Sequence, residues 1–416
     1  MIKKKSYILE LVFKQIRNLI LIALLSALTS CSNKPEDIEL AFRNNLDIER
    51  RNEVIHINCS SLKNFPLDDF SVVDVNKESV IPYQLVDKDK DGVSDELVLL
   101  CDFSQNETKK VRIVKSPIIK NNSEYTDVFF SLRSDSAQPN PKINDTVRPR
   151  GFIQDIKNPV YQLEGPALEN NKVAFRTFFD TRNGKDIYGK TIENTVLKSI
   201  GLGESWHKLR YWGMDILQVG QSLGAGGLGV VDKDTLYRLG DADLTKYQEI
   251  CDGPFEASFR LDFTGWDAGN KKINGYELLS LAKDKHYYKN EICLSDTSLI
   301  LAIGLPGFKC RHTNYIKHNG GFSSIYTYGP QAADTDTRLG LAILFDSEQY
   351  LGHDFVEDNG EIQKTHYVML RPQPVNHIYF FACWELSDST FSEEVNFIDY
   401  LQEEANKLFN PIITTL

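Results

Sequence analysis

The chain carries its densest set of chemically active side chains between residues 205 and 231, in the stretch SWHKLRYWGMDILQVGQSLGAGGLGVV. An imidazole and a phenol stand near its start, as His207 and Tyr211. General acid–base catalysis needs two such proton-exchanging groups in one place. We therefore predict that His207 and Tyr211 are the catalytic acid and base. The alternative for His207 is an ordinary hydrogen-bonded histidine.

The backbone of this stretch decides which side chains meet. On a strand, alternate residues share a face, so His207 and Tyr211 would lie together while Arg210 pointed away. In a loop, which the surrounding glycines favour, all of these side chains can converge. The cleft that carries the chemistry is expected to contain Arg210 or Arg176.

Cationic and aromatic side chains in and before the stretch suit an acidic, sugar-like ligand. Arginine holds a carboxylate or sulfate through paired hydrogen bonds, and an indole ring can stack on a sugar face. The predicted substrate-binding residues are Arg176, Arg182, Arg210, Trp206, Trp212 and Asp215. The competing interpretations are ion pairs around a surface hairpin for the first two arginines and core packing for the tryptophans.

Two further histidines provide an alternative catalytic site. His312 and His318 lie in the basic segment KCRHTNYIKHNGG. They lack the HExxH spacing of a zinc-binding helix, so this pair alone does not indicate a metal site. Their imidazoles suit acid–base work or simple exposure to water.

The end of the stretch, GQSLGAGGLGVV, is unusually rich in glycine. A phosphate-binding loop of the Walker type would need a Lys-Ser or Lys-Thr pair, which is missing here. Nucleotide binding is therefore not indicated. The remaining interpretations are close approach of a ligand and a bulged strand–loop–strand crossing without chemistry.

The segment DKDKDGVSDE resembles a calcium-binding loop. Counted from Asp87, oxygen ligands fall at positions one, three, five and nine with a glycine at six, as Asp87, Asp89, Asp91 and Asp95. Position twelve is Val98, where calcium loops carry a bidentate glutamate. A structural calcium ion and a plain hairpin turn both remain open, and no other cofactor is required.

Hydrophobic alternation predicts an all-β protein. Short alternating runs between residues 36 and 114 indicate a small antiparallel β-domain, followed by a polar linker. Residues 146–416 carry many strand-length runs rich in Val, Ile, Tyr and Phe, which indicate a large antiparallel β-sandwich. Only residues 393–408 have helical periodicity, which predicts a C-terminal helix with a solvated charged face. The expected divisions are 1–31, 32–145 and 146–416.

The first 31 residues are typical of a signal peptide. Basic residues precede an apolar run, which ends in Leu28-Thr29-Ser30-Cys31. This order resembles the lipobox of bacterial lipoproteins and implies acylation of Cys31. Ser32 after the cysteine favours the outer membrane. We expect a cell-envelope lipoprotein that contacts the membrane only through this lipid anchor.

Charge and cysteine spacing exclude several classes of partner and site. A net charge of −11 and a pI near 5.3 argue against nucleic acid as a partner, although a local basic pocket can still bind an acidic oligosaccharide. The cysteines after Cys31 lack CxxC spacing, which argues against zinc ribbons and thioredoxin chemistry. Most lie in apolar runs, which favours buried free thiols over disulfides.

Several segments resemble a family of bacterial lipoproteins that is found beside polysaccharide-degrading enzymes and has long been a domain of unknown function. They are RNGKDIYGK, WGMDILQVGQSLGAGGLGVV, TYGPQ, RLGLAILF and DKDGVSDELVLLCDF. The resemblance implies a sandwich like the supersandwich of galactose mutarotase. One branch of the family includes a dehydratase of ulvan oligosaccharides.

The resemblance implies a carbon–oxygen lyase, a dehydratase or β-eliminating enzyme, on uronic-acid-containing oligosaccharides. It supplies no catalytic residues. Two alternatives stand beside it, a non-catalytic glycan-binding lipoprotein and an enzyme of the mutarotase or epimerase type. The binding protein would use the same aromatic and cationic groups without an acid–base pair.

Overall fold

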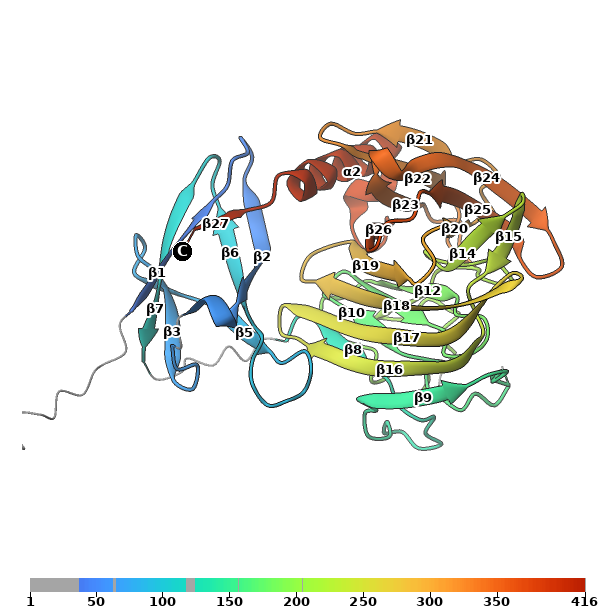
Figure 1. Ribbon diagram of the computed structural model, residues 1–416, viewed down its shortest axis with the longest axis horizontal. Helices are drawn as coiled ribbons and strands as arrows, with labels where there is room; N and C mark the ends of the chain where they lie inside the picture. The colour runs from blue at the N-terminus through green and yellow to red at the C-terminus, as the bar shows by residue number, and fades with distance from the viewer. Residues whose placement is uncertain (1–36, 63–64, 117–123, 156, 204, 416) are drawn as a thin grey trace, which may run out of the picture.

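The computed structural model describes residues 37–62, 65–116, 124–155, 157–203 and 205–415, which form two β-rich domains (Figure 1). The predicted signal peptide and Cys31 lie outside these ranges. Within them, no helix is both long and apolar enough to cross a bilayer. Every described cysteine is a free thiol, as the sequence predicts.

Alternation of apolar and polar residues builds the N-terminal domain, because it gives each strand one face for the core. In β2 (Arg50–Asn58), Ile55 and Ile57 are buried while His56 and Asn58 face outward. One sheet has the order β27-β1-β7-β3-β4 and the other the order β2-β6-β5. The remaining bounds are β1 (Ile38–Arg43), β3 (Phe70–Asp74), β4 (Ser79–Ile81), β5 (Tyr83–Val86), β6 (Glu96–Phe103), β7 (Thr108–Lys115) and β27 (Ile413–Thr415), with a 3-10 turn η1 at Cys59–Leu62.

The large domain contains a nine-stranded sheet of order β21-β22-β23-β26-β19-β18-β17-β16-β9. Its strands are β9 (Asp145–Pro149), β16 (Ala242–Asp252), β17 (Glu256–Ala268), β18 (Lys271–Ala282), β19 (Tyr287–Leu294), β21 (Asn314–Lys317), β22 (Phe322–Gly329), β23 (Leu339–Asp346) and β26 (Asn376–Trp384). All of its pairings are antiparallel. Turns η2 (Ser347–Gln349) and η3 (Ser389–Ser392) follow β23 and β26.

Two five-stranded antiparallel sheets complete this domain. The first has the order β13-β12-β11-β10-β8, with bounds β8 (Asp127–Phe129), β10 (Ala167–Glu169), β11 (Val173–Thr177), β12 (Lys185–Lys190) and β13 (Gly213–Asp215). The second has the order β15-β14-β20-β25-β24, with bounds β14 (Leu228–Asp232), β15 (Thr235–Arg238), β20 (Ile300–Pro306), β24 (Tyr350–Asp358) and β25 (Gln363–Leu370). The predicted all-β fold with antiparallel sheets is confirmed.

Two strands cross the division expected at residue 145. β8 lies before it yet pairs with β10 of the large domain. β27, at the end of the chain, pairs with β1 of the N-terminal domain, where Ala41 opposes Thr415. The chain therefore returns to its first domain, and the two domains are tied together at both ends (Figure 1).

The nine-stranded sheet and the sheet of β11 and β12 face each other across the main core (Figure 1). Phe175 of β11 packs edge-on against Tyr288 of β19, with ring centroids 4.8 Å apart. Tyr288 in turn stacks on Phe380 of β26 at 5.7 Å. These contacts bury the inward faces of both sheets and hold β12 and β13 in place below the candidate site.

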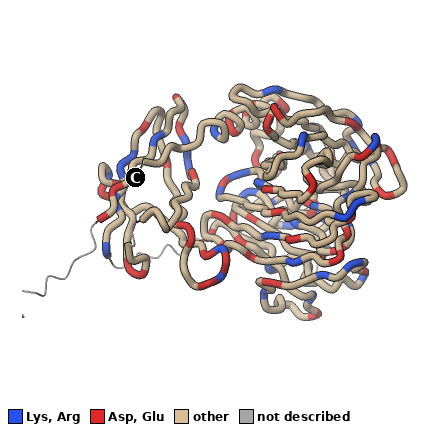
Figure 2. The backbone as a smooth tube through the Cα atoms, in the orientation of Figure 1, with Lys and Arg blue, Asp and Glu red and all other residues tan. Residues whose placement is uncertain are grey.

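Charged residues of β12 lie inside this domain rather than on its surface. Lys185 pairs with Glu277 at 2.7 Å and Lys190 pairs with Glu169 at 2.9 Å, and all four side chains are 0% exposed. Charged side chains are almost never fully buried unless they are paired. The alternative interpretation, in which the charged residues of this hairpin form surface ion pairs, is therefore wrong for Lys185 and Lys190, because the sheet is covered on both faces. Acidic and basic residues are interspersed over both domains (Figure 2).

The predicted C-terminal helix is α2 (Glu394–Phe409), which packs Phe397, Leu401 and Ala405 against the outer face of the nine-stranded sheet. Its charged face is not fully solvated. Glu404 is 2% exposed and accepts hydrogen bonds from Lys285 at 2.9 Å and from the Tyr287 hydroxyl at 3.0 Å. The prediction fails there because α2 also borders the N-terminal domain, which covers that side (Figure 1).

Candidate functional site

The segment from Ser205 to Trp212 is a loop of turns, so the strand alternative is wrong. The Arg210 and Gly213 backbones exchange hydrogen bonds of 2.9 and 3.2 Å, which close the second turn. The Asp215 N–H donates to the Trp206 carbonyl at 2.8 Å and ties the first turn to β13. These hydrogen bonds hold both turns of the loop against β13.

His207 and Asp215 face each other across this join. The His207 Nδ1 atom lies 3.5 Å from the Asp215 carboxylate. The imidazole is 60% exposed whereas the carboxylate is 3% exposed. The inner nitrogen of the imidazole therefore faces a buried carboxylate, while much of the ring is exposed on the surface. His207 is thus exposed to solvent on one side, and on the other side it contacts Asp215, which belongs to a buried cluster of charged residues.

Arg176 forms the centre of that cluster. Its guanidinium donates to Asp215 at 3.2 Å, to Asp186 at 3.1 Å and to the Tyr188 hydroxyl at 3.0 Å. Glu164 lies 3.6 Å from the same guanidinium. Burial, together with the charge of Asp186, raises the pKa of Asp215 well above its ordinary value in spite of Arg176. Burial also raises the pKa of Asp186. The cluster therefore binds a proton more readily than solvated carboxylates do.

The structure corrects the role predicted for Arg176. The residue is 3% exposed and its guanidinium is engaged by protein acceptors, so it does not present a free fork to a substrate carboxylate. The reason is that β11 and β12 place Arg176 opposite Asp186 within the sheet. Its contacts hold Asp215, which makes it a positioning residue.

Arg182 is likewise occupied by protein contacts. It donates to Glu164 at 2.8 Å and to Asp180 at 2.6 Å, and it stacks on the Phe178 ring at 4.0 Å. Phe178 also faces Arg176 at 4.8 Å and so separates the two guanidinium groups. Arg182 therefore holds Glu164 by a hydrogen bond and is not free to make the predicted contact with a substrate.

Glu164 is a site residue that the sequence did not reveal. It bridges Arg176 and Arg182, is 7% exposed and has a φ of +60°. Positive φ is uncommon outside glycine, and such backbone strain is concentrated at functional sites. The only signal in the sequence is the Gly165-Pro166 pair that follows, which marks a turn but not the contact.

The aromatic residues of the loop divide between core and surface. Trp212 is 7% exposed and packs on Tyr188 at 6.1 Å, so its predicted role in stacking on a sugar is wrong. Trp206 is half-buried, with its ring 5.5 Å from His207. Tyr211 is 77% exposed and Arg210 is half-buried in the same turn. The rim of the site is thus formed by the exposed His207 and Tyr211 and the half-buried Arg210.

The alternative histidine pair does not come together. β21 (Asn314–Lys317) lies between His312 and His318, and its four extended residues cover about 13 Å. His318 is 3% exposed and bonds to Ser324 at 2.8 Å and to Gln402 of α2 at 3.2 Å. Burial lowers the pKa of His318, which keeps it neutral. These contacts make His318 a structural residue.

The glycine-rich segment is a close-packed crossing. A Cβ at Gly224 would lie 2.2 Å from the Lys185 carbonyl, and Gly224 has a φ of +74°. The segment also contains GQSLG, which matches the GxSxG pattern of a nucleophile elbow. Ser222 is 1% exposed, however, and its hydroxyl donates to the Val219 carbonyl at 2.6 Å. The segment serves packing, and Ser222 is not presented to a substrate.

The acidic loop after β5 gathers part of the predicted calcium ligands. Carboxylate oxygens of Asp87, Asp89 and Asp95 lie within 4.8 Å of one another. Asp91 is not in this group, and its carboxylate accepts the Val93 N–H at 2.7 Å. Calcium prefers oxygen ligands of this kind. The three remaining carboxylates fit the ion, and calcium binding there stays a prediction.

The chain resembles one curated protein along nearly its whole length. It is 23% identical over 428 residues to "Uncharacterized protein P7" of Formosa agariphila, which covers 96% of this chain and 98% of that protein.

Two solved structures are also similar. One is an alpha-mannosidase from Enterococcus faecalis V583, with a TM-score of 0.47, 9% identity and coverage of 91% of this chain and 46% of the other. The other is a protein in the glycosyl hydrolase family 38 from Enterococcus faecalis, with a TM-score of 0.48, 9% identity and coverage of 92% and 48%. The chain spans about half the length of these structures.

A family model described as "Domain of unknown function (DUF4861)" matches residues 42–413. The match runs from β1 to β27 and includes the His207 loop, Asp215 and the buried arginine cluster. The protein therefore belongs to the DUF4861 family.

Proposed function

We propose that the protein is a carbohydrate-active lyase that eliminates water or an alcohol from uronic-acid-containing oligosaccharides. The observation that carries the proposal is the pair of the exposed His207 and the buried Asp215, 3.5 Å apart. Elimination beside a carboxylate needs a base for the C5 proton and an acid for the departing oxygen. The sequence resemblance to a family with an oligosaccharide dehydratase supports the same class of reaction.

His207, Asp215 and Tyr211 have separate roles in the proposed reaction. His207 takes the proton from C5, and Asp215 holds the imidazole in the orientation that this transfer needs. The electron pair of the C–H bond forms the C4–C5 double bond while the C4–O bond breaks. Tyr211 supplies a proton to the departing oxygen, which leaves as water or as a sugar hydroxyl. The atoms and charges balance without an external oxidant or reductant.

The substrate carboxylate gains negative charge as the C5 proton leaves, so a cation near it stabilises the transition state. Arg176 is buried and Arg182 is held by Asp180 and Glu164. Arg210 lies between His207 and Tyr211 in the turn that leads into β13. We assign the contact with the substrate carboxylate to it. Its planar guanidinium suits a bidentate contact of this kind.

The test follows the ultraviolet absorbance of the conjugated alkene during incubation with uronic oligosaccharides. His207→Ala and Tyr211→Phe should each lower turnover by about 10² to 10⁴, the usual contribution of an acid–base group. Leu209→Ala is the control, because Leu209 is 50% exposed in the same turn and has no proton to exchange. If turnover fell by less than about tenfold in both variants, the catalytic site would lie outside this loop.

Product analysis separates the neighbouring functions. Dehydration lowers the product mass by one water, whereas an epimerase or mutarotase leaves the mass unchanged. Binding of the oligosaccharides without any product would instead support a glycan-binding lipoprotein. Either result would overturn the proposed elimination.

A further inference from the structure

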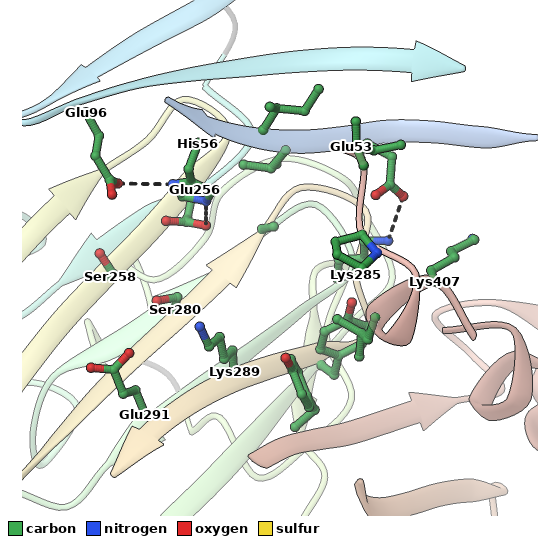
Figure 3. Close-up of a pocket in the computed structure, with 18 of the residues that line it drawn as sticks. Glu53, His56, Glu96, Glu256, Ser258, Ser280, Lys285, Lys289, Glu291 and Lys407 are labelled. Atoms are coloured by element: carbon green, nitrogen blue, oxygen red, sulfur yellow. Dashed lines mark hydrogen bonds and ion pairs between the residues drawn. The ribbon is translucent and has the colours of Figure 1, made fainter. Parts of the chain in front are cut away.

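A cavity of about 550 Å³ lies between the two domains, away from the His207 loop (Figure 3). One wall comes from β2, β6 and the end of the chain after α2, and the floor comes from β17, β18 and β19. Binding sites for small molecules have volumes of about 300–1,000 Å³. The cavity shares no residue with the His207 and Arg176 cluster.

A row of polar side chains crosses the floor of this cavity. Ser258 of β17 pairs with Ser280 of β18, which pairs with Lys289 of β19, which pairs with Tyr379 of β26. Residues in direct register across a sheet share one face. All four line the cavity, and Figure 3 shows the two serines and the lysine side by side.

The lysine of this row is not neutralised by the protein. Other cations of the cavity are paired, as Arg50 is with Glu53 and Lys285 with Glu404, both at 2.9 Å. Within the described ranges, the Lys289 ammonium forms no ion pair or hydrogen bond, and neither do the Ser258 and Ser280 hydroxyls. A half-buried ammonium beside two unbonded hydroxyls presents donors to an anionic group.

Acceptors for hydroxyl groups lie around the same row. Glu256 and Glu291 line the cavity on either side of it (Figure 3). Burial raises the pKa of Tyr379 to about 12, so its hydroxyl keeps its proton and can donate. The lining therefore combines one free cation with several hydroxyls and carboxylates, a set that complements a molecule with one acidic group and several hydroxyls.

We propose that the interdomain cavity binds a small polyhydroxylated acid, with its carboxylate on Lys289 and its hydroxyls on Ser258, Ser280 and the flanking glutamates. This site is distinct from the loop assigned to elimination, and the inference does not depend on that reaction. It gives the small N-terminal domain a function, since that domain supplies one wall of the site.

Isothermal titration of the purified protein with D-glucuronate, D-glucose and acetate tests the proposal. Glucuronate should bind more tightly than glucose, which lacks the carboxylate, and than acetate, which lacks the hydroxyls. Lys289→Met keeps the aliphatic stem and removes the charge, and it should weaken glucuronate binding by about tenfold or more. Lys246→Met is the matched control, because Lys246 is exposed on the same sheet outside the cavity.

The His207→Ala variant separates the two sites, because the part of glucuronate binding that depends on Lys289 should remain when the loop is changed. Loss of glucuronate binding in His207→Ala but not in Lys289→Met would move the binding to the loop and overturn the inference. Absence of glucuronate binding, equal binding of glucose, or equal binding of acetate would also overturn it. Ser258→Ala with Ser280→Ala should reduce the preference for glucuronate over acetate.

Discussion

The Nε2 atom of His56 lies 3.3 Å from the Glu256 carboxylate and joins the N-terminal domain to the large domain. Its Nδ1 atom faces Glu96 at 3.1 Å (Figure 3). Lys88 bonds to the other oxygen of Glu96 at 2.6 Å. Burial opposes a charge on His56, but Glu256 and Glu96 raise the pKa of the imidazole to about 10. The hydrogen bond from His56, with help from Lys88, lowers the pKa of Glu96 to about 2.

The contact between the domains should depend on pH. The pKa of His56 rises from 6.5 to about 10 on folding, so its contribution is complete below pH 6.5 and is lost as the pH rises to 10. The pKa of Glu96 falls from 4.5 to about 2, so its contribution is present above pH 4.5 and is lost as the pH falls to 2. The contact is therefore strongest between pH 4.5 and 6.5.

His56→Gln should flatten the fall in Tm between pH 6.5 and 10. Because the imidazole is 41% exposed, solvent screening limits the effect on stability to about 1 kcal/mol or less. Thermal unfolding across this range measures it, with His312→Gln as the control, since His312 is exposed and forms no described ion pair. Identical pH profiles for His56→Gln and the wild type would contradict the assignment.

Lys190→Met should destabilise the large domain strongly. The change leaves Glu169 buried without its cation, and breaking a buried ion pair costs about 3–5 kcal/mol. The Val196 and Leu197 N–H groups still donate to Glu169, which favours the lower end of that range. Urea unfolding is the measurement.

Lys172→Met is the comparison for this variant. Lys172 pairs with Glu193 at 3.3 Å, where Glu193 is 74% exposed, and exposed pairs contribute about 1 kcal/mol or less. Equal losses in Lys172→Met and Lys190→Met would mean that burial of the Lys190 pair is unimportant for stability.

Local pattern predicted the elements of this fold but not the contacts of its site. The alternation of Ile55 and Ile57 with polar neighbours is a property of the segment itself, and it predicts a strand directly. Glu164 meets Arg176 only because the chain turns back, where the Phe179 N–H bonds to the Glu164 carbonyl at 2.9 Å. Spacing in sequence carries no information about that closure.

The sequence also did not reveal which charged side chains are buried. Lys185 and Lys190 stand in a polar run, RNGKDIYGK, that reads as a surface hairpin. Both are buried because partners from other strands, Glu277 and Glu169, neutralise them. The prediction for His207 rested only on its neighbours in the chain, whereas the contacts of Arg176 depend on Asp186 of the strand beside it.

Calcium should stabilise the N-terminal domain through Asp87, Asp89 and Asp95. A ligand that binds only the folded state at about ten times its Kd adds about 1.4 kcal/mol. Thermal unfolding with calcium and with chelator should show this difference, and Asp95→Asn should abolish it. Asp91→Asn is the control, because Asp91 lies outside the group. Superimposable curves with calcium and chelator would leave a hairpin turn stabilised by its own hydrogen bonds.

Cys31→Ala should release the protein from the membrane fraction or leave its signal peptide uncleaved. The motivation is the order of basic, apolar and small residues that ends at Cys31. Cell fractionation with immunodetection measures the change. A variant that stayed in the membrane fraction with a normally processed N-terminus would exclude the lipid anchor.

Asp215→Asn should lower kcat on uronic oligosaccharides by about 10² or more while leaving KM nearly unchanged. The amide keeps the size of the carboxyl group but removes the acidic group that faces His207 Nδ1 at 3.5 Å, so the imidazole is no longer held in one orientation. In a serine protease triad the same change costs about 10⁴ through the wrong histidine tautomer. KM should stay nearly unchanged because Asp215 is 3% exposed and does not reach the substrate.

Asp186→Asn separates orientation of His207 from general damage to the cluster. Asp186 holds Arg176 at 3.1 Å, as Asp215 does at 3.2 Å, but it forms no contact with His207 in the described structure. Its kcat should therefore fall much less than that of Asp215→Asn, with both variants folded by circular dichroism. If the two variants lost kcat equally, the effect would come from Arg176 and its cluster, and Asp215 would not be the residue that orients His207.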